Sequence, residues 1–444
     1  MTALYAPGTE ETDPKKQNRA LQLYAGAIAT NTTNITALQS ASVVSATKFG
    51  VVGDGASAND TAIAAAIAYC VANNVTLGFP DGVYNHASTI EWAYPRLRVI
   101  AFGANVVFAH TGTGIAHSFN GLTHGDPAQG VFECVFGGAH RIALKGNSGT
   151  TKLAYVNNWH HGEMKIRGRD AQYIFYGDNA GGTGQAAAVS STFDVQISQN
   201  ADGVAFSVVP DIGLYLNSFF NCIFVKPLVE GCGHASNMAV QMVGSSNNTF
   251  WGGSAESNLA GGMSMDSASV HNIFLGTDFE SNGGSYDLHV TGSYNTFLNV
   301  QTSATTSGQL IDGSRNVFQS CILQSATVSG AKNLLENCGF LVAFTDSGFL
   351  NTIINPDTLA TAVTHLDASL TLASATAVPA GGTTGLGLGF SSTTNLGVFF
   401  GSGVPTLSAA QGSLYLRTDG SSTSTRLYVN TNGTTGWTNV VTAT

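Results

Sequence analysis

The chain contains few charged side chains. Lys, Arg, Asp and Glu together make up 10% of its 444 residues, whereas a typical soluble domain has about 25%. The 17 Lys and Arg residues are scattered singly and the net charge is −10. Binding to a phosphate backbone requires clustered basic residues, so we expect no nucleic-acid partner. The 43% hydrophobic content is enough to bury a core, which excludes a disordered chain.

Long apolar runs are also missing. No run of about 18 apolar residues occurs, and the opening sequence MTALYAPGTEETDPKKQNR lacks the apolar core of a secretory signal. We therefore expect no membrane insertion and no cleaved signal peptide.

The six cysteines form no CxxC pair, and none stands with histidine at the spacing of a metal site. We expect buried thiols, no bound metal and no cofactor. The cysteines are Cys70, Cys134, Cys222, Cys232, Cys321 and Cys338.

An internal repeat is present. The stretch NNTFWGGSAESN, from Asn247, returns 24 residues later as HNIFLGTDFESN, from His271. A period of about 20 to 50 residues indicates one structural unit stacked on copies of itself. With Phe250 and Phe274 as anchors, the same position falls at Phe219, Phe297, Phe318, Leu335 and Ile353.

An asparagine stands two residues before each anchor. We interpret this column as a ladder at a turn, where side-chain amides satisfy backbone groups. Its predicted members are Asn217, Asn248, Asn272, Asn295, Asn316, Asn333 and Asn351.

The third and fifth positions after the anchors are small or apolar, which predicts that they point inward. Side chains alternate along a strand, so the chain must bend after the anchor, where Gly252 and Gly276 stand. The pattern predicts an all-β fold, a parallel β-helix with coils about 4.8 Å apart. The third positions are Cys222, Gly253, Thr277, Val300, Cys321 and Cys338, and the fifth are Phe224, Ala255, Phe279, Thr302, Leu323 and Phe340.

A helix is expected before the repeats. Asn59 and Asp60 form a predicted helix cap, and apolar residues follow at helical spacing. Such a helix would cover the open end of the first coil. The apolar residues are Ile63, Ala66, Ile67, Cys70 and Val71.

The segment TKFGVVGDGASANDTAIAAAIAYCVANNVTLGFPDGVY, from Thr47 to Tyr84, resembles the opening of the pectate lyase superfamily of right-handed β-helices, in the form carried by bacteriophage tailspikes. The repeated rungs resemble the same family, and together they span 43–357. The resemblance implies a right-handed β-helix in a homotrimeric tail protein that meets a bacterial surface polysaccharide. Some relatives depolymerise that polysaccharide and many only bind it.

Four regions are expected. Residues 1–42 would form an N-terminal helical segment for attachment to a phage tail or baseplate protein and for trimerisation. The apolar residues of this segment follow a heptad-like spacing, which suits a short coiled coil or an amphipathic helix lying on the solenoid. Residues 43–357 would form the β-helix, and 358–402, rich in Ala, Thr, Gly and Ser, a linker or stalk. Residues 403–444, with Asp-Gly and Asn-Gly turns, would form an antiparallel β-module.

Three acids are predicted to share one outward patch. The fourth and sixth positions after the anchors point outward, so Glu256 should stack on Glu280 with Asp278 beside them. Like charges at that distance raise a pKa and give a protonated acid beside an ionised partner, as glycoside hydrolysis requires. These three residues are therefore the candidate catalytic residues.

Substrate-binding candidates lie beside the acids. The indole face of Trp251 could stack on a sugar, and Asn258 and Asn282 follow the two glutamates. Asp194, Asp202, Glu230 and His234 lie near or within the long step between Phe219 and Phe250, with no role indicated.

Three functions stay open at this point. The first is a phage tailspike or tail fibre protein, assembled into the virion after synthesis in the host cytoplasm, that recognises a host polysaccharide and hydrolyses it. The second is the same protein as a non-enzymatic adhesin or structural component, with the acids as a solvated ladder. The third is a secreted bacterial pectinolytic enzyme. Hydrolysis is favoured over lyase chemistry, because the calcium-binding acids of pectate lyases are not seen.

Overall fold

The structure is a computed structural model of the chain. It describes residues 43–124, 131–179, 186–198, 205–233, 237–284, 286–302, 308–340, 342–354, 358–359, 364–365, 386–389 and 396–441. The expected N-terminal helical segment (1–42) and most of the expected linker (358–402) lie outside the described residues.

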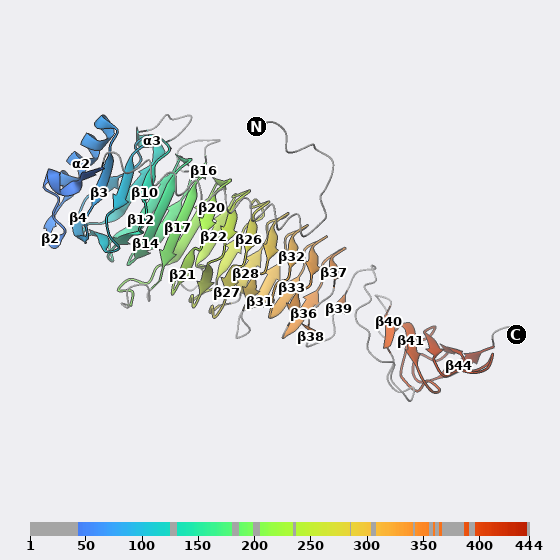
Figure 1. Cartoon of the computed structure of the whole chain (residues 1–444). Coiled ribbons are helices and arrows are strands. Elements are labelled where there is room, and N and C mark those ends of the chain that lie inside the picture. The colour runs from blue at the N-terminus through green and yellow to red at the C-terminus, as the bar shows by residue number, and fades with distance from the viewer. Residues whose placement is uncertain are drawn as a thin grey trace, which may run out of the picture.

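The described chain winds into a right-handed parallel β-helix, as predicted. Figure 1 shows the short strands of successive coils side by side along one axis, with a separate small sheet beyond the last coil. Every paired strand between β1 and β39 is parallel to its neighbour, which leaves one hydrophobic core running along the inside of the solenoid.

Two long sheets form the walls. The 21-stranded sheet contains β1 (Val43–Ser45), β2 (Asp54–Ala58), β3 (Thr76–Phe79), β4 (Gly82–His86), β6 (Arg98–Ala101), β7 (Val106–His110), β10 (Val135–Gly137), β11 (Ile142–Lys145), β14 (Glu163–Arg169), β17 (Thr192–Ile197), β20 (Ile223–Val225), β21 (Leu228–Glu230), β23 (Thr249–Trp251), β24 (Ser254–Glu256), β26 (Ile273–Leu275), β27 (Asp278–Phe279), β29 (Thr296–Leu298), β30 (Gln301–Thr302), β32 (Val317–Gln319), β34 (Leu334–Glu336) and β37 (Thr352–Ile354). The 12-stranded sheet contains β5 (Ile90–Glu91), β8 (Gly114–Asn120), β12 (Thr150–Asn157), β15 (Tyr173–Gly177), β18 (Ile212–Asn217), β22 (Val240–Val243), β25 (Met263–Met265), β28 (Tyr286–Val290), β31 (Gly308–Ile311), β33 (Ser325–Val328), β36 (Ala343–Asp346) and β39 (Thr364–His365).

Two smaller sheets complete the coils. One contains β9 (Val131–Phe132), β13 (Trp159–His160), β16 (Ala188–Val189) and β19 (Phe219–Phe220), and the other contains β35 (Gly339–Phe340) and β38 (Thr358–Leu359). Because β38 and β39 pair with β35 and β36, the solenoid continues past the boundary expected at 357.

The predicted anchor column forms the core of the C-terminal coils. Phe250 pairs with Phe274 in register and their rings stack at 4.6 Å, and the stack continues to Phe297 and Phe318. The prediction was wrong one coil upstream, where the residue in register with Phe250 is Phe224 rather than Phe219. Phe219 belongs to the four-stranded sheet.

The asparagine ladder is confirmed from Asn248 to Asn351. In each step the Oδ1 atom of one asparagine accepts the backbone N–H of the asparagine one coil before, and its Nδ2 donates to a carbonyl inside the turn. Asn217 is not a member, because it pairs with Val243 on the 12-stranded sheet. Cys222 takes the ladder position in that coil, and its backbone N–H donates to Asn248 Oδ1 at 2.9 Å.

Each turn of the coil uses one residue in the left-handed conformation. Directly before the asparagine ladder, Asn247 and His271 both have a φ of 58°. After the anchor strand, Gly252 and Gly276 have φ values of 64° and 62°. The glycines thus stand at the predicted bend, and Thr277 and Phe279 beyond it are buried as expected.

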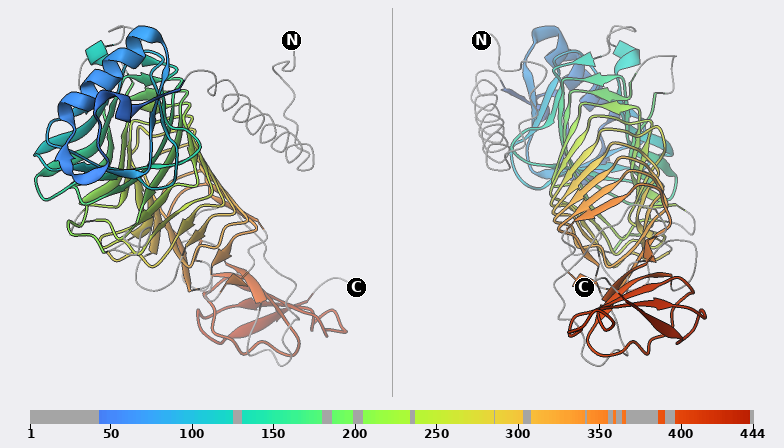
Figure 2. Two further views of the ribbon diagram at one scale, coloured as in Figure 1. Left: turned by 60° about the vertical axis from the view of Figure 1, so that its left-hand side comes forward. Right: turned by 90° about the vertical axis from the view of Figure 1, so that its right-hand side faces the viewer.

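A helix covers the N-terminal end of the solenoid. Helix α2 (Asp60–Asn73) follows the short helix η1 (Ala46–Phe49), and Figure 2 shows α2 lying across the first coils. Its buried side chains are those of Ile63, Ala66, Ile67 and Cys70, four of the five that the spacing predicted, and the fifth, Val71, is partly buried against the core. A third helix, α3 (Gly121–His124), is a single turn.

The predicted cap pair does not cap the helix through its side chains. Asn59 Oδ1 accepts the N–H of Val52 at 2.7 Å instead of a helix N–H. Asp60 accepts the backbone N–H groups of Ala87 and Ser88. The pair therefore connects the helix to the first coils.

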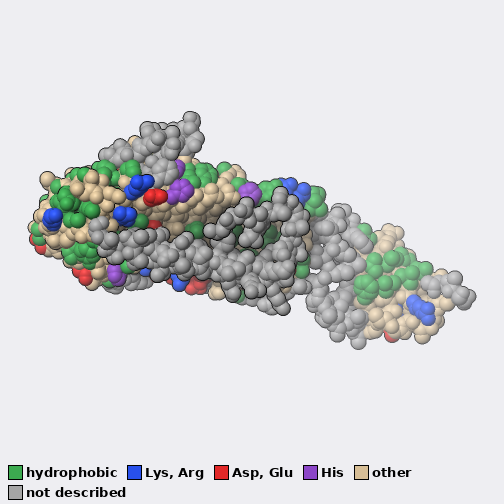
Figure 3. All heavy atoms as spheres, turned by 45° about the horizontal axis from the view of Figure 1, so that its top comes forward, with side chains coloured by type: hydrophobic (Ala, Val, Ile, Leu, Met, Phe, Trp, Pro, Cys, Tyr) green, Lys and Arg blue, Asp and Glu red, His purple; other side chains and the backbone are tan. Residues whose placement is uncertain are grey.

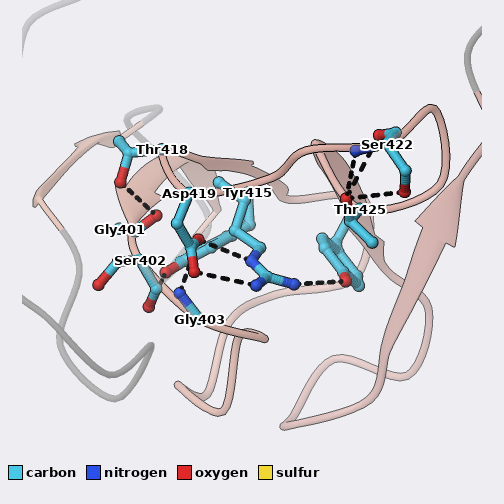
Figure 4. A network of polar contacts seen from close by, with 10 residues as sticks. Gly401, Ser402, Gly403, Tyr415, Thr418, Asp419, Ser422 and Thr425 are labelled. Carbon is cyan, nitrogen blue, oxygen red and sulfur yellow. Dashed lines mark hydrogen bonds and ion pairs between the residues drawn. The ribbon is translucent and has the colours of Figure 1, made fainter.

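The C-terminal module is a mixed sheet rather than a purely antiparallel one. It contains β40 (Leu386–Gly389), β41 (Gly397–Gly401), β42 (Leu414–Arg417), β43 (Leu427–Asn430) and β44 (Trp437–Val440), and β41 pairs with β42 in parallel. It also begins before the expected boundary at 403. Within this module the Arg417 guanidinium donates to Asp419 at 2.8 Å and to the Tyr428 hydroxyl at 3.4 Å. Figure 4 shows the polar network around Asp419.

Among the described helices, none is both long and apolar enough to cross a membrane.

Candidate acidic site on the solenoid

Three glutamates lie in register on consecutive coils. Glu230, at the end of β21, pairs with Glu256, at the end of β24. Ser254 pairs with Asp278, so the next coil places Glu280 in line with Glu256, and the N–H of Ser257 bonds to the carbonyl of Glu280 at 3.0 Å. We call Glu230, Glu256, Glu280 and Asp278 the acidic site.

Glu230 is the member whose role the sequence left open. The misplaced anchor at Phe219 put it out of phase, whereas an anchor at Phe224 places it six residues later, as Glu256 follows Phe250. The hydroxyl of Ser198, one coil further upstream, donates to Glu230 Oε2. The acidic site therefore extends over three coils, and Ser198 borders it on the coil upstream.

Asp278 lies beside the glutamates on the same outer face. It pairs with Ser254 on one side and with Gln301 on the other. One of its carboxyl oxygens, Oδ1, is shielded from solvent and has no hydrogen-bond partner among the described residues. A neutral carboxyl group is less costly than a charged one in this position.

The surroundings raise two of the pKa values. Partial burial, followed by the charges of Glu230, Glu280 and Asp278, raises the pKa of Glu256. Partial burial and the charge of Glu280 raise the pKa of Asp278. Among the described residues, no Lys or Arg forms an ion pair with Glu256, Asp278 or Glu280. The arrangement can thus hold protonated and ionised carboxyl groups side by side.

Trp251 lies on the neighbouring face, across the bend at Gly252. Its side chain points outward and is 37% exposed, between Val225 and Leu275 of the adjacent coils. Other outward residues of this face are also apolar. We call them, with Trp251, the apolar stripe: Ile223, Val225, Ile273, Leu275, Leu298, Val317, Leu334 and Ile354.

Asn258 and Asn282 lie inside the coil, with exposed fractions of 1% and 2%. The Nδ2 of Asn258 donates to Asn282 Oδ1 at 2.9 Å, and Asn282 donates to Asp287. They form a second buried ladder, headed by the N–H of Cys232. Their side chains are therefore not available to a substrate on the outer surface, contrary to the sequence-based expectation.

Of the remaining candidates, the one that the structure describes, Asp194, does not join the site. Asp194 accepts a hydrogen bond from Arg141 Nε at 2.7 Å. Asp202 and His234 lie outside the described residues. Within the described part of the chain, no group of three or more His, Cys, Asp or Glu residues is arranged to hold a metal ion.

Comparisons with known proteins identify similar folds only. The sequence matches no protein-family model and no curated protein. Among solved structures, the tailspike protein of Acinetobacter phage vB_ApiP_P1 is similar with a TM-score of 0.49 and 13% identity, over 90% of this chain and 86% of that one. The catalytic domain of Agl-KA gives a TM-score of 0.49 at 13% identity, over 71% of this chain and 66% of that one. The GH87 alpha-1,3-glucanase from Streptomyces thermodiastaticus strain HF3-3 gives 0.43 at 12%, over 73% and 70%.

Proposed function

We propose that the protein is a bacteriophage tailspike or tail fibre protein that recognises a polysaccharide on the bacterial surface and hydrolyses it at the acidic site. The observation that carries the proposal is the line of Glu230, Glu256 and Glu280 on three consecutive coils, with Asp278 beside them. The phage context rests on the sequence resemblance of 47–84 and of the repeated rungs.

The proposed chemistry divides the acids by charge. Glu256 or Asp278, whose pKa values are raised, donates a proton to the glycosidic oxygen. An ionised neighbouring carboxylate attacks the anomeric carbon, or takes a proton from a water that attacks it, as the bond from that carbon to the protonated glycosidic oxygen breaks and the second sugar leaves as an alcohol. Water completes the hydrolysis of any glycosyl-enzyme formed. Paired strands lie about 4.8 Å apart, close to the separation of about 5 to 5.5 Å between the carboxyl groups of retaining glycosidases.

Self-association is part of the proposal. The apolar stripe includes Trp251, Ile273 and Ile354, which are 37%, 38% and 38% exposed. Thr249, Thr296, Gln319, Glu336 and Thr352 alternate with these apolar side chains on the same face. Exposed apolar side chains on one face support contact between copies of the chain, and we propose a homotrimer. In the virion, residues 1–42 would attach it to a tail or baseplate protein.

Reducing-end release tests the enzymatic part. The full chain is incubated with capsular and lipopolysaccharide preparations from a panel of bacteria, beside Glu256→Gln, Glu280→Gln and the control Glu336→Gln, whose carboxylate lies outside the site on β34. We expect release by the parent and the control, and a loss of about 100-fold or more in the two site variants. Binding without release by all four proteins would favour the adhesin. Release that both site variants retain would refute the assignment of the site.

A further inference from the structure

One edge of the solenoid carries an exposed residue with positive φ in each described coil from Arg96 to Leu350. This residue directly precedes the position of the asparagine ladder, and we call the column the corner ridge. Its members are Arg96, Glu133, His161, Ser190, Asn221, Asn247, His271, Tyr294, Arg315, Lys332 and Leu350.

The last coils of the ridge differ from the other turns of the solenoid. The left-handed region favours Gly and Asn, and in the coils of His271 to Lys332 the bend after the anchor strand uses small or polar residues, namely Gly276, Asn299, Ser320 and Asn337. The ridge instead carries bulky residues with φ values between 57° and 60° in five consecutive coils: His271, Tyr294, Arg315, Lys332 and Leu350. Unfavourable backbone conformations that persist in a row are a pointer to function.

The side chains of this stretch are in contact with one another. The His271 and Tyr294 rings stack with centroids 5.1 Å apart and planes at 28°. The Arg315 guanidinium lies 5.2 Å from the Tyr294 ring, which is itself 45% exposed. Figure 3 shows one face of the molecule, on which a few purple and blue side chains stand among hydrophobic and uncharged ones.

The stretch is also basic within an acidic protein. Among the described residues, neither Arg315 nor Lys332 forms an ion pair with a carboxylate. Glu336, four residues after Lys332, is hydrogen-bonded by the amide of Gln319 at 2.9 Å. Because the net charge is −10, a polyanion is repelled by the molecule as a whole and attracted at this stretch.

We propose that His271, Tyr294, Arg315 and Lys332 form a binding site for an acidic polysaccharide lying along the solenoid axis. The inference rests on the proposed function and names the substrate class as a glycan that carries carboxylates. Coils rise by about 4.8 Å, so the four side chains span roughly 14 Å along such a polymer. The guanidinium and ammonium groups bind its carboxylates. The ring faces of Tyr294 meet His271 and Arg315, so its exposed edge and hydroxyl contact the sugar.

The test measures binding of polygalacturonate, a carboxylate polymer, and of dextran, a neutral one, at low ionic strength. The ridge variant is Arg315→Asn with Lys332→Asn, since Asn tolerates a positive φ and the fold is kept. The control, Lys145→Gln with Arg426→Gln, removes the same charge from exposed positions elsewhere. Tyr294→Asn tests the ring.

We expect the parent and the control to bind polygalacturonate but not dextran, with affinity falling as salt is added, and the ridge variant to bind at least tenfold more weakly. Equal binding by ridge variant and parent, or no binding by the parent, would overturn the inference. A change of oligomeric mass in the ridge variant would also overturn it, since the ridge would then be a contact between copies. An oligonucleotide that binds as tightly as polygalacturonate would overturn the ligand class.

The two proposals fail separately. Release of reducing ends from a host polysaccharide without ridge-dependent polygalacturonate binding leaves the proposed function standing and removes this inference. Ridge-dependent binding without release from any polysaccharide removes hydrolysis and leaves the ridge as a binding site.

Discussion

Replacing Asn295 by Ala tests the role of the buried asparagine ladder. The Oδ1 atom of Asn295 accepts the backbone N–H of Asn272 at 2.8 Å, and its Nδ2 donates to the Ser269 carbonyl at 3.1 Å. The side-chain Nδ2 of Asn272 still donates to the Ser245 carbonyl, and Asn316 Oδ1 still accepts the backbone N–H of residue 295. The substitution therefore leaves two buried backbone groups without these partners.

Each such group costs about 1 to 3 kcal/mol, so Asn295→Ala should lower the free energy of unfolding by roughly 2 to 6 kcal/mol. Urea unfolding followed by circular dichroism measures this, with Asn105→Ala as the control. Asn105 is an exposed asparagine outside both ladders, and its change should stay within about 0.5 kcal/mol.

Hydrogen exchange gives the local measurement. The N–H of Asn272 should lose protection in Asn295→Ala, while that of Asn333, whose acceptor is Asn351, keeps it. A loss of stability below about 1 kcal/mol together with unchanged protection at Asn272 would refute the reasoning that these amides hold the turns.

Three further outcomes follow from the structure. The pKa of Glu256 is raised above its unfolded value of 4.5, so the contribution of this group to stability is present below about pH 4.5 and is lost as the pH rises through the raised pKa. Glu256→Gln should therefore raise the melting temperature at about pH 7 and leave it unchanged at about pH 4. A lower melting temperature of the variant at neutral pH contradicts this. All six cysteines are buried, and burial raises the pKa of Cys222 to about 12. Ellman's reagent should therefore label no thiol until the protein is unfolded. Rapid labelling of the native protein would contradict the burial of the cysteines. In Gly253→Ala a new Cβ would lie 2.2 Å from the carbonyl oxygen of Pro227 at a φ of 87°, which should lower the free energy of unfolding by about 2 to 4 kcal/mol. In Gly276→Ala the new Cβ meets nothing within 4 Å, and the free energy of unfolding should fall by about 1 kcal/mol. Equal decreases for the two variants in urea unfolding would contradict the close approach at Gly253.

The fold could be predicted where the rungs keep their asparagine and phenylalanine. From Asn248 to Phe318 each coil repeats both residues, and the asparagine continues to Asn351, so the ladder and the ring stack follow from the spacing alone. Upstream the same ladder position holds Gly162, Ser191 and Cys222, in register through the strand pairs. Without the asparagine, the pattern offered Asn217 and Phe219 instead, and that coil was placed five residues out of phase.

The acidic site was predictable only in its repeated part. Glu256, Asp278 and Glu280 lie in regular rungs, and the alternation of side chains from the bend onward places them outward. The same alternation fails for Asn258, because Ser257, with a φ of 54°, makes a corner and turns the next side chain inward.

The most direct test of the account is a structure of Glu256→Gln with an oligosaccharide cut from the polysaccharide that the parent protein degrades. The account predicts a sugar unit across the acidic site, with a glycosidic oxygen within hydrogen-bond distance of residue 256 or Asp278 and a ring facing Glu280. An oligosaccharide bound on another face of the solenoid, with Glu230, Asp278 and Glu280 untouched, would contradict it.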